Sequence, residues 1–324
     1  MANVYAVVMA GGRGERFWPL STDERPKPFL PLLGTTTLLQ DTVERLRPLI
    51  PLERIHISIG TAHCNLAREQ LPQLPHDNYI VEPLGRDTAA CLGFSALHLE
   101  RKDPDAIMLA LPADHFITDD AAFRRTLQKG IDNLAGATAV VFGITPARPE
   151  TGYGYIQAEK PAVGSDAWPV IRFIEKPDAA NATRFVKSGG YFWNSGMFLW
   201  SNRILLELLQ KHMPTTYRAL DALRPLLGRS DAHPELLRIF SGLQRISIDF
   251  GVLEKVSRLR LIPAEFGWDD IGNWASLERA LGADAHGNVA RGRSAAVQSD
   301  GCILYSDAGT IAAFGVSELV IVQA

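Results

Sequence analysis

The chain has 324 residues, of which 46% are hydrophobic and 21% are charged, so it can bury a large core. Its formal net charge is -3. That balance gives no basic surface of the kind that neutralises a nucleic-acid backbone or an anionic membrane, and neither is expected as a partner. The cysteines Cys64, Cys91 and Cys302 are far apart in the sequence, which indicates neither a disulfide framework nor a zinc site. A reducing, cytoplasmic location is expected, and no run of about 18 apolar residues predicts a membrane span.

Short apolar runs alternate with segments of helical spacing in the first half of the chain. The runs are residues 4–9, 55–59, 107–111 and 139–143. Apolar residues throughout a strand-length run predict burial on both faces, which is typical of parallel sheets. Segments 38–49 and 123–134 instead repeat apolar residues at helical spacing. This alternation predicts an α/β fold with a doubly wound, mostly parallel, Rossmann-like sheet.

The pattern changes twice further along the chain. From about residue 150 extended aromatic and glycine-rich stretches appear, followed by expected helices around 178–188, 202–212 and 216–227. After residue 282 short alternating runs are separated by turn residues, and they are too short and too few to bury a core alone. We therefore expect a main domain over 1–282 and a small β appendage over 283–324. A partial β-helix is one form it could take, and a contact in a homodimer is the preferred role.

The first apolar run leads directly into a turn rich in glycine and arginine, Gly11, Gly12, Arg13, Gly14, Glu15 and Arg16. Glycines let the backbone approach an anion closely and direct amides toward it, and the two arginines add positive charge. A dinucleotide-binding turn would need glycine at Phe17, and a P-loop would need Gly-Lys-Ser or Gly-Lys-Thr. Both are therefore excluded, and a phosphate site or an ordinary glycine turn remains.

A lysine between two prolines follows this turn, in the segment Pro26-Lys27-Pro28. Because proline fixes φ and disfavours helix, we expect Lys27 on a stiff, extended segment. A solvated surface lysine rarely needs such a support. The segment therefore favours a functional role for Lys27.

Eight motifs occur in order between Val4 and Trp274. They are Gly-Gly-x-Gly-x-Arg, Pro-Lys-Pro-Phe-Leu, Glu-Pro-x-x-Arg, Leu-Pro-Ala-Asp-His, Gly-Tyr-Gly-Tyr-Ile, Phe-Ile-Glu-Lys-Pro, Trp-Asn-Ser-Gly-Met and Trp-x-Asp-Ile-Gly-x-Trp. Together they strongly resemble the nucleotidyl-sugar pyrophosphorylase family, most closely the members that make GDP-mannose. The resemblance implies a nucleotidyltransferase domain that transfers GMP from GTP to α-D-mannose 1-phosphate and releases pyrophosphate. The expected partners are these two substrates and Mg²⁺.

Two other functions stay open at this point. One is a guanylyltransferase for another hexose or heptose 1-phosphate. The other is a non-catalytic regulatory subunit that binds a sugar nucleotide. In the leading scheme, Arg16 and Lys27 hold the triphosphate and stabilise charge on the leaving pyrophosphate, and no covalent nucleophile is needed.

Two acids are candidates for the metal. Asp114 follows an apolar strand at its carboxyl end, where ligands bind in open α/β sheets. Mg²⁺ commonly takes one or two carboxylates together with phosphate oxygens. The resemblance assigns Asp270 as the second ligand and leaves Asp269 as an outer neighbour. The alternatives are a helix N-cap for Asp114 and a turn-forming role for Asp270.

The sugar phosphate is expected to contact Gly154, Glu175, Lys176 and Asn194. The resemblance implies that Glu175 accepts sugar hydroxyls and that Lys176 meets the phosphate. The alternatives are a bulge or turn at Gly154, a surface ion pair for Glu175 and Lys176, and a turn-capping role for Asn194. Asp249 and Glu254 are weaker candidates, explained equally well by a helix N-terminus. His115 is interpreted as a core or turn histidine.

The base is expected to lie against Glu82, Asp87 and Thr88. A carboxylate can accept from both N1–H and the 2-amino group of guanine, a donor pair that adenine lacks. Members of the family usually have Asn-Thr-Ala-Pro where this chain has Asp87-Thr88-Ala89-Ala90. The sequence therefore departs from the family at two of four positions in this segment.

Overall fold

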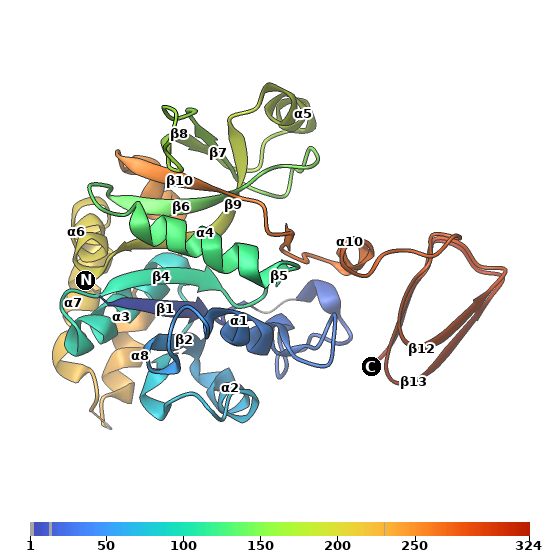
Figure 1. The fold of residues 1–324 in the computed structure, drawn as a ribbon. Coiled ribbons are helices and arrows are strands. Elements are labelled where there is room, and N and C mark those ends of the chain that lie inside the picture. The colour runs from blue at the N-terminus through green and yellow to red at the C-terminus, as the bar shows by residue number, and fades with distance from the viewer. Residues whose placement is uncertain (1–2, 13–14, 230) are drawn as a thin grey trace.

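The computed structural model describes residues 3–12, 15–229 and 231–324. The fold is α/β, as predicted, and is built on a nine-stranded sheet of order β3-β2-β1-β4-β9-β6-β10-β8-β7 (Figure 1). Its strands are β1 (Val4–Met9), β2 (Ile55–Gly60), β3 (Tyr79–Glu82), β4 (Ile107–Pro112), β6 (Ala139–Ile144), β7 (Tyr155–Ala158), β8 (Trp168–Ile174), β9 (Tyr191–Ser201) and β10 (Leu259–Ala264). The four apolar runs picked out in the sequence correspond to β1, β2, β4 and β6, so these strand predictions are confirmed.

Half of this sheet is parallel. β1 pairs in parallel with β2 on one side and β4 on the other, and β2 pairs in parallel with β3. Beyond β4 the long strand β9 runs antiparallel to both β4 and β6, and β7 and β8 are antiparallel as well. Beyond β4 one pairing, of β6 with β10, is parallel. The sheet is therefore mixed, because β8 and β9 run against the other strands. Strand direction could not be predicted because an apolar run is equally buried in either direction.

Helices cover both faces of the sheet. They are α1 (Leu38–Leu46), α2 (Cys64–Gln70), α3 (Asp87–Lys102), α4 (Asp120–Asp132), α5 (Ala179–Ser188), α6 (Asn202–His212), α7 (Pro214–Asp221), α8 (His233–Ser241), α9 (Ile248–Gly251) and α10 (Leu277–Leu281). Alternate residues of β1 belong to two separate cores, one shared with α1, α2, α4 and α5 and the other with α3 and α6 to α9. Within the described ranges, no helix is long and apolar enough to cross a membrane.

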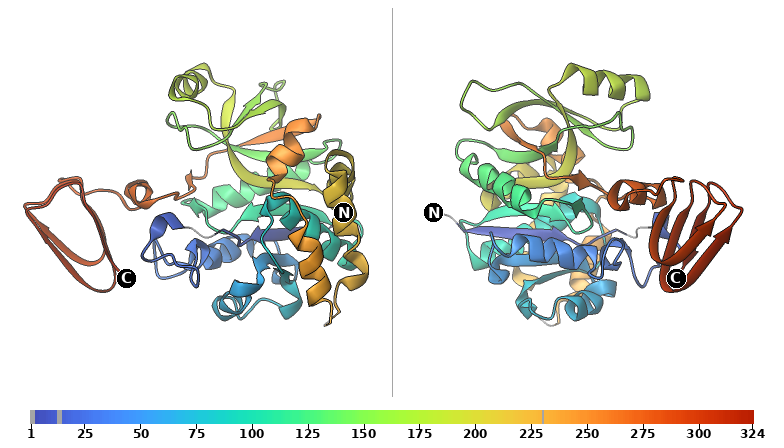
Figure 2. Two further views of the ribbon diagram at one scale, coloured as in Figure 1. Left: turned by 180° about the vertical axis from the view of Figure 1, so that it is seen from behind. Right: turned by 45° about the vertical axis from the view of Figure 1, so that its right-hand side comes forward.

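The C-terminal segment forms a separate three-stranded sheet of β12 (Val289–Val297), β13 (Ile303–Phe314) and β14 (Val320–Gln323). Consecutive strands are parallel, with Val289 opposite Ile303 and Ile303 opposite Val320. Figure 2 shows these strands stacked at one end of the molecule, beside the N-terminal segment that follows β1. The predicted short strands are confirmed, and their contact with the body of the protein is described below.

Candidate active site

The candidate site is at the carboxyl edge of the parallel half of the sheet. Because β1, β3 and β4 are parallel, the segments that follow them leave from the same edge. The strand order reverses between β1 and β4, and a crevice forms at such a point in open α/β sheets. β1 leads into Gly11 and β4 leads to Asp114, so this crevice lies between two predicted site segments.

A small sheet brings the distant acidic segment to the same place. β5 (Phe116–Ile117) pairs antiparallel with β11 (Trp268–Asp269), and Asp269 stands opposite Phe116. Asp114 is two residues before β5, and Asp270 follows β11 directly. This pair of short strands brings Asp114 and Asp270 to the same place, although they are more than 150 residues apart in the chain.

Lys27 connects the two acidic segments. Its side chain is buried, and Nζ donates to Oδ2 of Asp114 at 2.8 Å and to the backbone oxygen of Asp270 at 2.5 Å. The prediction of an extended segment is wrong, because Lys27–Phe29 forms one turn of 3-10 helix that begins after Pro26. Proline is tolerated in a first helical turn, where its missing N–H has no partner to lose. The prolines still fix the backbone, and they present the lysine to two carboxylate-bearing segments.

The Lys27 ammonium controls the charge state of Asp114. Burial alone would raise the pKa of Asp114, but the Lys27 ammonium and its hydrogen bond lower it below the ordinary value. The side chain therefore stays ionised beside a cation. The alternative of a helix N-cap is wrong, because Asp119 caps α4 by accepting from the amide of Ala122 at 2.8 Å.

The neighbouring acids Asp269 and Asp270 have different surroundings. Asp269 is buried and accepts from Nε of Arg279 at 2.6 Å and from the amide of Ile271 at 2.9 Å, so the turn-forming role belongs to it. Asp270 accepts from the hydroxyl of Tyr153 at 2.7 Å and lines the cavity described below. Burial raises the pKa of Asp270, as do the nearby acids. Of the two, Asp270 is the one placed for a ligand.

The glycine- and arginine-rich turn lies next to these acids. Gly11 and Gly12 are exposed, and Gly12 has φ +100°, a conformation that favours glycine. Arg13 and Gly14 lie outside the described residues. A Cβ atom placed on Gly272 would lie 3.4 Å from Nη1 of Arg16 and 3.3 Å from both carboxylate oxygens of Asp270. Arg16 therefore stands near Asp270, across the narrow space above Gly272.

The predicted base segment lies at the end of β3 and the start of α3. Glu82 is buried, accepts from the hydroxyl of Ser58 at 3.0 Å, and has its pKa raised by burial. Asp87 has φ +67° and accepts from the amide of Thr88 at 2.7 Å. The hydroxyl oxygen of Thr88 accepts from the amide of Ile248 at 2.8 Å, which ties α3 to α9. Thr88 thus has a structural contact whatever else it binds.

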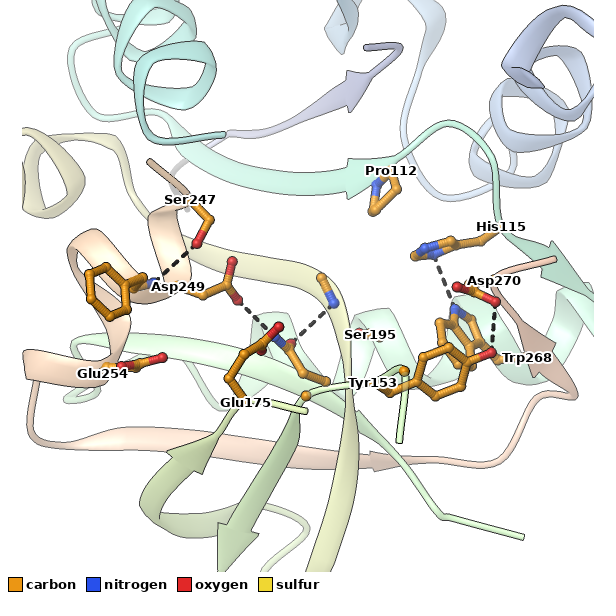
Figure 3. Close-up of a pocket in the computed structure, with 15 residues that line it drawn as sticks. Pro112, His115, Tyr153, Glu175, Ser195, Ser247, Asp249, Glu254, Trp268 and Asp270 are labelled. Carbon is orange, nitrogen blue, oxygen red and sulfur yellow. Dashed lines mark hydrogen bonds between the residues drawn. The ribbon is translucent and has the colours of Figure 1, made fainter. Parts of the chain in front are cut away.

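A cavity of about 370 Å³ extends from Asp270 toward β9 and α9 (Figure 3). Its lining residues are Pro112, His115, Gly152, Tyr153, Gly154, Glu175, Asn194, Ser195, Gly196, Ser247, Asp249, Phe250, Glu254, Trp268 and Asp270. Three of the four predicted sugar-phosphate residues are among them. In Figure 3, His115, Trp268 and Asp270 lie toward one end, and Asp249 and Glu254 toward the other.

Gly154 lies close to Glu175. A Cβ atom there would lie 2.8 Å from Oε2 of Glu175, so a larger residue would displace that exposed carboxylate from its present position. The Lys176 ammonium lies 3.3 Å from Oε1 of Glu175, and both side chains are exposed. The ion pair considered from the sequence therefore exists, and it stands at the rim of the cavity.

Asn194 connects the predicted sugar-phosphate residues to Asp249, which was only a weaker candidate from the sequence. Its Nδ2 donates to Oδ1 of Asp249 at 2.7 Å, while its Oδ1 accepts from the amide of Gly196 at 3.1 Å. The turn-capping alternative thus explains the hydrogen bond accepted by Oδ1 but not the one donated by Nδ2. Ser247 caps α9 and Asp249 is the acid of its first turn, so the helix N-terminus expected there is present. Burial raises the pKa of Asp249 to about 6, and the nearby Glu175 and Glu254 add to the shift.

An aromatic group at the Asp270 end of the cavity was missed by the sequence reasoning. Trp268 Nε1 donates to Nδ1 of His115 at 3.1 Å, and Tyr153 packs edge-on against Trp268. Burial lowers the pKa of His115 to about 4, so the ring is neutral near pH 7. His115 is buried, as expected of a core histidine, but it also lines the cavity. Its position directly after Asp114 was the signal available in the sequence.

Backbone strain occurs in three segments of the candidate site and in three segments elsewhere. Six described non-glycine residues have positive φ, and three of them are Asp87 (φ +67°), Lys176 (φ +39°) and Ile271 (φ +44°). For a β-branched residue such as Ile271 this conformation is a genuine outlier. Strain of this kind persists only where the surroundings enforce it, and it is commonly found at functional sites. The three strained residues thus mark the base, sugar-phosphate and metal segments.

The fold and site define a nucleotidyltransferase, and comparison with known proteins agrees. The nucleotidyl transferase family model matches residues 5–286, so the chain belongs to that family.

Three bacterial proteins illustrate the similarity. The chain is 37% identical over 333 residues to mannose-1-phosphate guanylyltransferase of Escherichia coli strain K12, covering 99% of this chain and 69% of that protein. It is 38% identical to mannose-1-phosphate guanylyltransferase RfbM of Salmonella typhimurium strain LT2, covering 98% and 67%. A crystal structure from Thermus thermophilus, described as a mannose-1-phosphate geranyltransferase, superimposes with a TM-score of 0.89 at 40% identity, covering 99% of this chain and 92% of that one. The chain spans about two thirds of the length of the curated relatives it matches.

Because the pKa of Asp249 is raised in the folded protein, we expect its ionisation to lower the stability of the fold as the pH rises. The native pKa of about 6 lies above the ordinary value of 3.8, so unfolding releases a proton between those pH values. The contribution of this group to stability therefore falls as the pH rises from about 4 to 6 and stays low above 6. Asp249→Asn, which keeps an acceptor for Asn194, should be more stable than the wild type at pH 8 by about 1–3 kcal/mol.

Urea unfolding at several pH values measures this difference. It should shrink as the pH falls from 6 to 4. Asp300→Asn, a change at an exposed carboxylate of the appendage, serves as the control and should show no such trend. An Asp249→Asn variant that is less stable than the wild type at pH 8 would contradict the assignment.

Proposed function

We propose that the protein transfers GMP from GTP to α-D-mannose 1-phosphate, giving GDP-mannose and pyrophosphate. The observation that carries the proposal is the meeting of Lys27, Asp114 and Asp270 beside a cavity lined by Glu175 and Asn194. The charged side chains of Lys27, Asp114 and Asp270 suit a polyphosphate, and the hydrogen-bonding side chains of Glu175 and Asn194 suit a sugar. The choice of guanine and mannose rests on the names of the relatives.

The triphosphate would be held by the turn over residues 11–14, with Arg16 and Lys27 beside it. Exposed glycines leave room for phosphate oxygens against backbone amides. Arg16 stands near Asp270, and Lys27 already bridges Asp114 and the Asp270 backbone. Both cations therefore lie where charge would develop on departing pyrophosphate.

The donor set fits a hard divalent cation. Asp114 and Asp270 approach Lys27 from two elements, and within the described residues no group of three or more His, Cys, Asp or Glu side chains is arranged for a metal. Two carboxylates plus phosphate oxygens match what Mg²⁺ takes in nucleotide sites, and zinc would need more protein ligands. When bound, Mg²⁺ would neutralise phosphate charge and help to align the two substrates. Asp269, held by Arg279, would fix the position of its neighbour Asp270.

The sugar phosphate would occupy the cavity. Glu175 and Asn194 would contact sugar hydroxyls, Gly154 would allow the ring close to the backbone, and Lys176 at the rim would meet the phosphate. Asp249 adds a further acceptor through its bond to Asn194. Carboxylates and amides that hold one another in place suit recognition of several neighbouring hydroxyls.

The nucleotide base would lie against Glu82, Asp87 and Thr88. Burial keeps Glu82 in a fixed position, and Ser58 bonds one of its oxygens. The Cys91 thiol is a further partner of this carboxylate, which would also accept from donors on guanine. The strained backbone at Asp87 supports a role for this segment in binding.

The reaction would be an in-line displacement. An oxygen of the sugar phosphate attacks the α-phosphorus of GTP, and the bond between that phosphorus and the bridging oxygen to the β-phosphate breaks. The electron pair leaves with pyrophosphate, where Arg16 and Lys27 would stabilise it. No side chain needs to form a covalent bond, because two polyanions are brought together by fixed positive charge.

We further propose the cytoplasm as the location, since Cys64, Cys91 and Cys302 are free and buried. We interpret the parallel half of the sheet, with helices on both faces, as a doubly wound unit within a domain over 1–282. Residues 283–324 are interpreted as a partial β-helix. Its consecutive parallel strands are joined by segments too short for the usual crossover helix. A β-helix, in which the chain winds through successive parallel strands, explains such short connections.

A pyrophosphate-release assay tests the activity. GTP, ATP, UTP, CTP and dTTP are each combined with the 1-phosphates of mannose, glucose, fucose and a heptose, with Mg²⁺. GTP with mannose 1-phosphate should give the highest kcat/KM, and chelation of the metal should abolish release. Release from no pair, with GDP-mannose still bound, would instead indicate the regulatory subunit, and preference for another sugar would indicate the alternative guanylyltransferase.

We also propose a homodimer in which the appendage takes part. Its outer surface exposes apolar side chains at Val297, Phe314, Leu319 and Val320, with Val297 opposite Phe314. Light scattering should give a mass near twice 35.5 kDa. Phe314→Glu should reduce it to that of a monomer, and a wild-type monomer at micromolar concentration would contradict the proposal.

A further inference from the structure

A third hydrophobic core lies apart from the two that cover the main sheet. Its buried members are Phe17, Leu30, Leu32, Leu38, Ile271, Leu277, Val289 and Tyr305. They come from four separated parts of the chain, and the last two belong to the appendage. The appendage is therefore part of a core that it shares with the main domain.

This core lies directly behind the proposed catalytic side chains. Arg16 immediately precedes Phe17, and Asp270 immediately precedes Ile271. Lys27 begins the 3-10 turn whose closing residue is Leu30, through the bond from the Leu30 amide to the Lys27 carbonyl. Arg16, Lys27 and Asp270 thus each lie within a few residues of an apolar side chain that is buried in this core.

Tyr305 is the main contact from the appendage. It is 1% exposed, and its hydroxyl donates to the carbonyl oxygen of Pro31 at 3.2 Å. The guanidinium of Arg291 lies over the ring, 4.9 Å from its centroid, and also donates to the carbonyl oxygen of Gly34. Two appendage side chains therefore hold the backbone that follows Lys27, and the right-hand view of Figure 2 shows the two segments together.

Trp274 extends the contact from Tyr305 to the phosphate turn. Its ring meets the edge of Tyr305 with centroids 5.4 Å apart, and meets Phe17 at 5.2 Å. Its Nε1 donates to the carbonyl oxygen of Trp18 at 3.2 Å. One ring thus joins the appendage to the segment that carries Arg16.

The strained backbone at Ile271 depends on the same core. Ile271 has φ +44° and a fully buried side chain. A β-branched residue in this conformation is strained and persists only where packing enforces it. The core that encloses it includes Val289 and Tyr305, so the appendage helps to keep Asp270 in place.

We propose that Tyr305 is a positioning residue for the nucleotide end of the active site. Through Pro31 and Trp274 it holds the segments that carry Lys27 and Arg16, so the appendage forms a wall of the triphosphate site in addition to any contact between subunits. The kinetic consequence rests on the proposed function, whereas the structural consequence does not. The sugar end of the cavity is lined by none of these residues.

The test compares Tyr305→Phe, which removes only the hydroxyl, with Leu304→Val. Leu304 is equally buried, but it faces the inner core of the appendage with Cys302 and Ile311. Loss of one net hydrogen bond should raise the KM for GTP by about two- to tenfold and leave the KM for mannose 1-phosphate within about twofold. Leu304→Val should change the melting temperature without changing either KM.

Hydrogen exchange of the full-length protein gives a second readout that needs no substrate. Amides of residues 15–34 should exchange faster in Tyr305→Phe than in the wild type, and at the wild-type rate in Leu304→Val. Unchanged exchange in that segment together with an unchanged KM for GTP overturns the proposal, whatever the melting temperature. If the wild type releases no pyrophosphate, the proposed function fails, but the exchange comparison still decides whether Tyr305 positions the segment.

Discussion

The site depends on one partly buried ion pair, between Lys27 and Asp114. An ammonium removed from water is costly unless it is paired and hydrogen-bonded, and Lys27 meets both conditions through the Asp114 carboxylate and the Asp270 carbonyl. Those three residues belong to the 3-10 turn after β1, to the end of β4 and to the end of β11. The pair therefore adds a polar link between segments that are also joined by the pairing of β5 with β11 and by the third core. It also keeps Asp114 ionised in the position where a cation would compete with the Lys27 ammonium for its oxygens.

The two halves of the sheet around this ion pair contribute different parts of the site. The parallel half of the sheet supplies the edge from which the glycine turn, Glu82 and Asp114 project, while β9 and β10 are embedded in the other half, where the cavity opens. The long antiparallel strand β9 joins the halves, because it pairs with β4 on one side and β6 on the other. Asn194, near its start, reaches Asp249 on α9. The third core then supports the nucleotide end from behind, and part of it is contributed by the last 40 or so residues of the chain.

Much of this could be predicted from the sequence, for identifiable reasons. Apolar runs gave β1, β2, β4 and β6, and the ordered motifs selected residues that the fold brings to one edge or one cavity. The direction of β9 could not be predicted, since burial does not depend on strand direction. The 3-10 turn at Lys27 was missed because proline disfavours long helices but not a first turn. Asp249 and Tyr305 were underrated because their partners, Asn194 and Pro31, are distant in the chain, and a single sequence carries no signal for such contacts.

The central claim is that Lys27, Asp114 and Asp270 form one site for a cation and a triphosphate. Anomalous diffraction from crystals soaked with Mn²⁺ and a non-hydrolysable GTP analogue tests it most directly. The account predicts one strong peak within coordination distance of the Asp114 and Asp270 carboxylates, with the Lys27 ammonium against phosphate oxygens. A peak at Asp269 instead, or an analogue bound with no contact to Lys27, would contradict it.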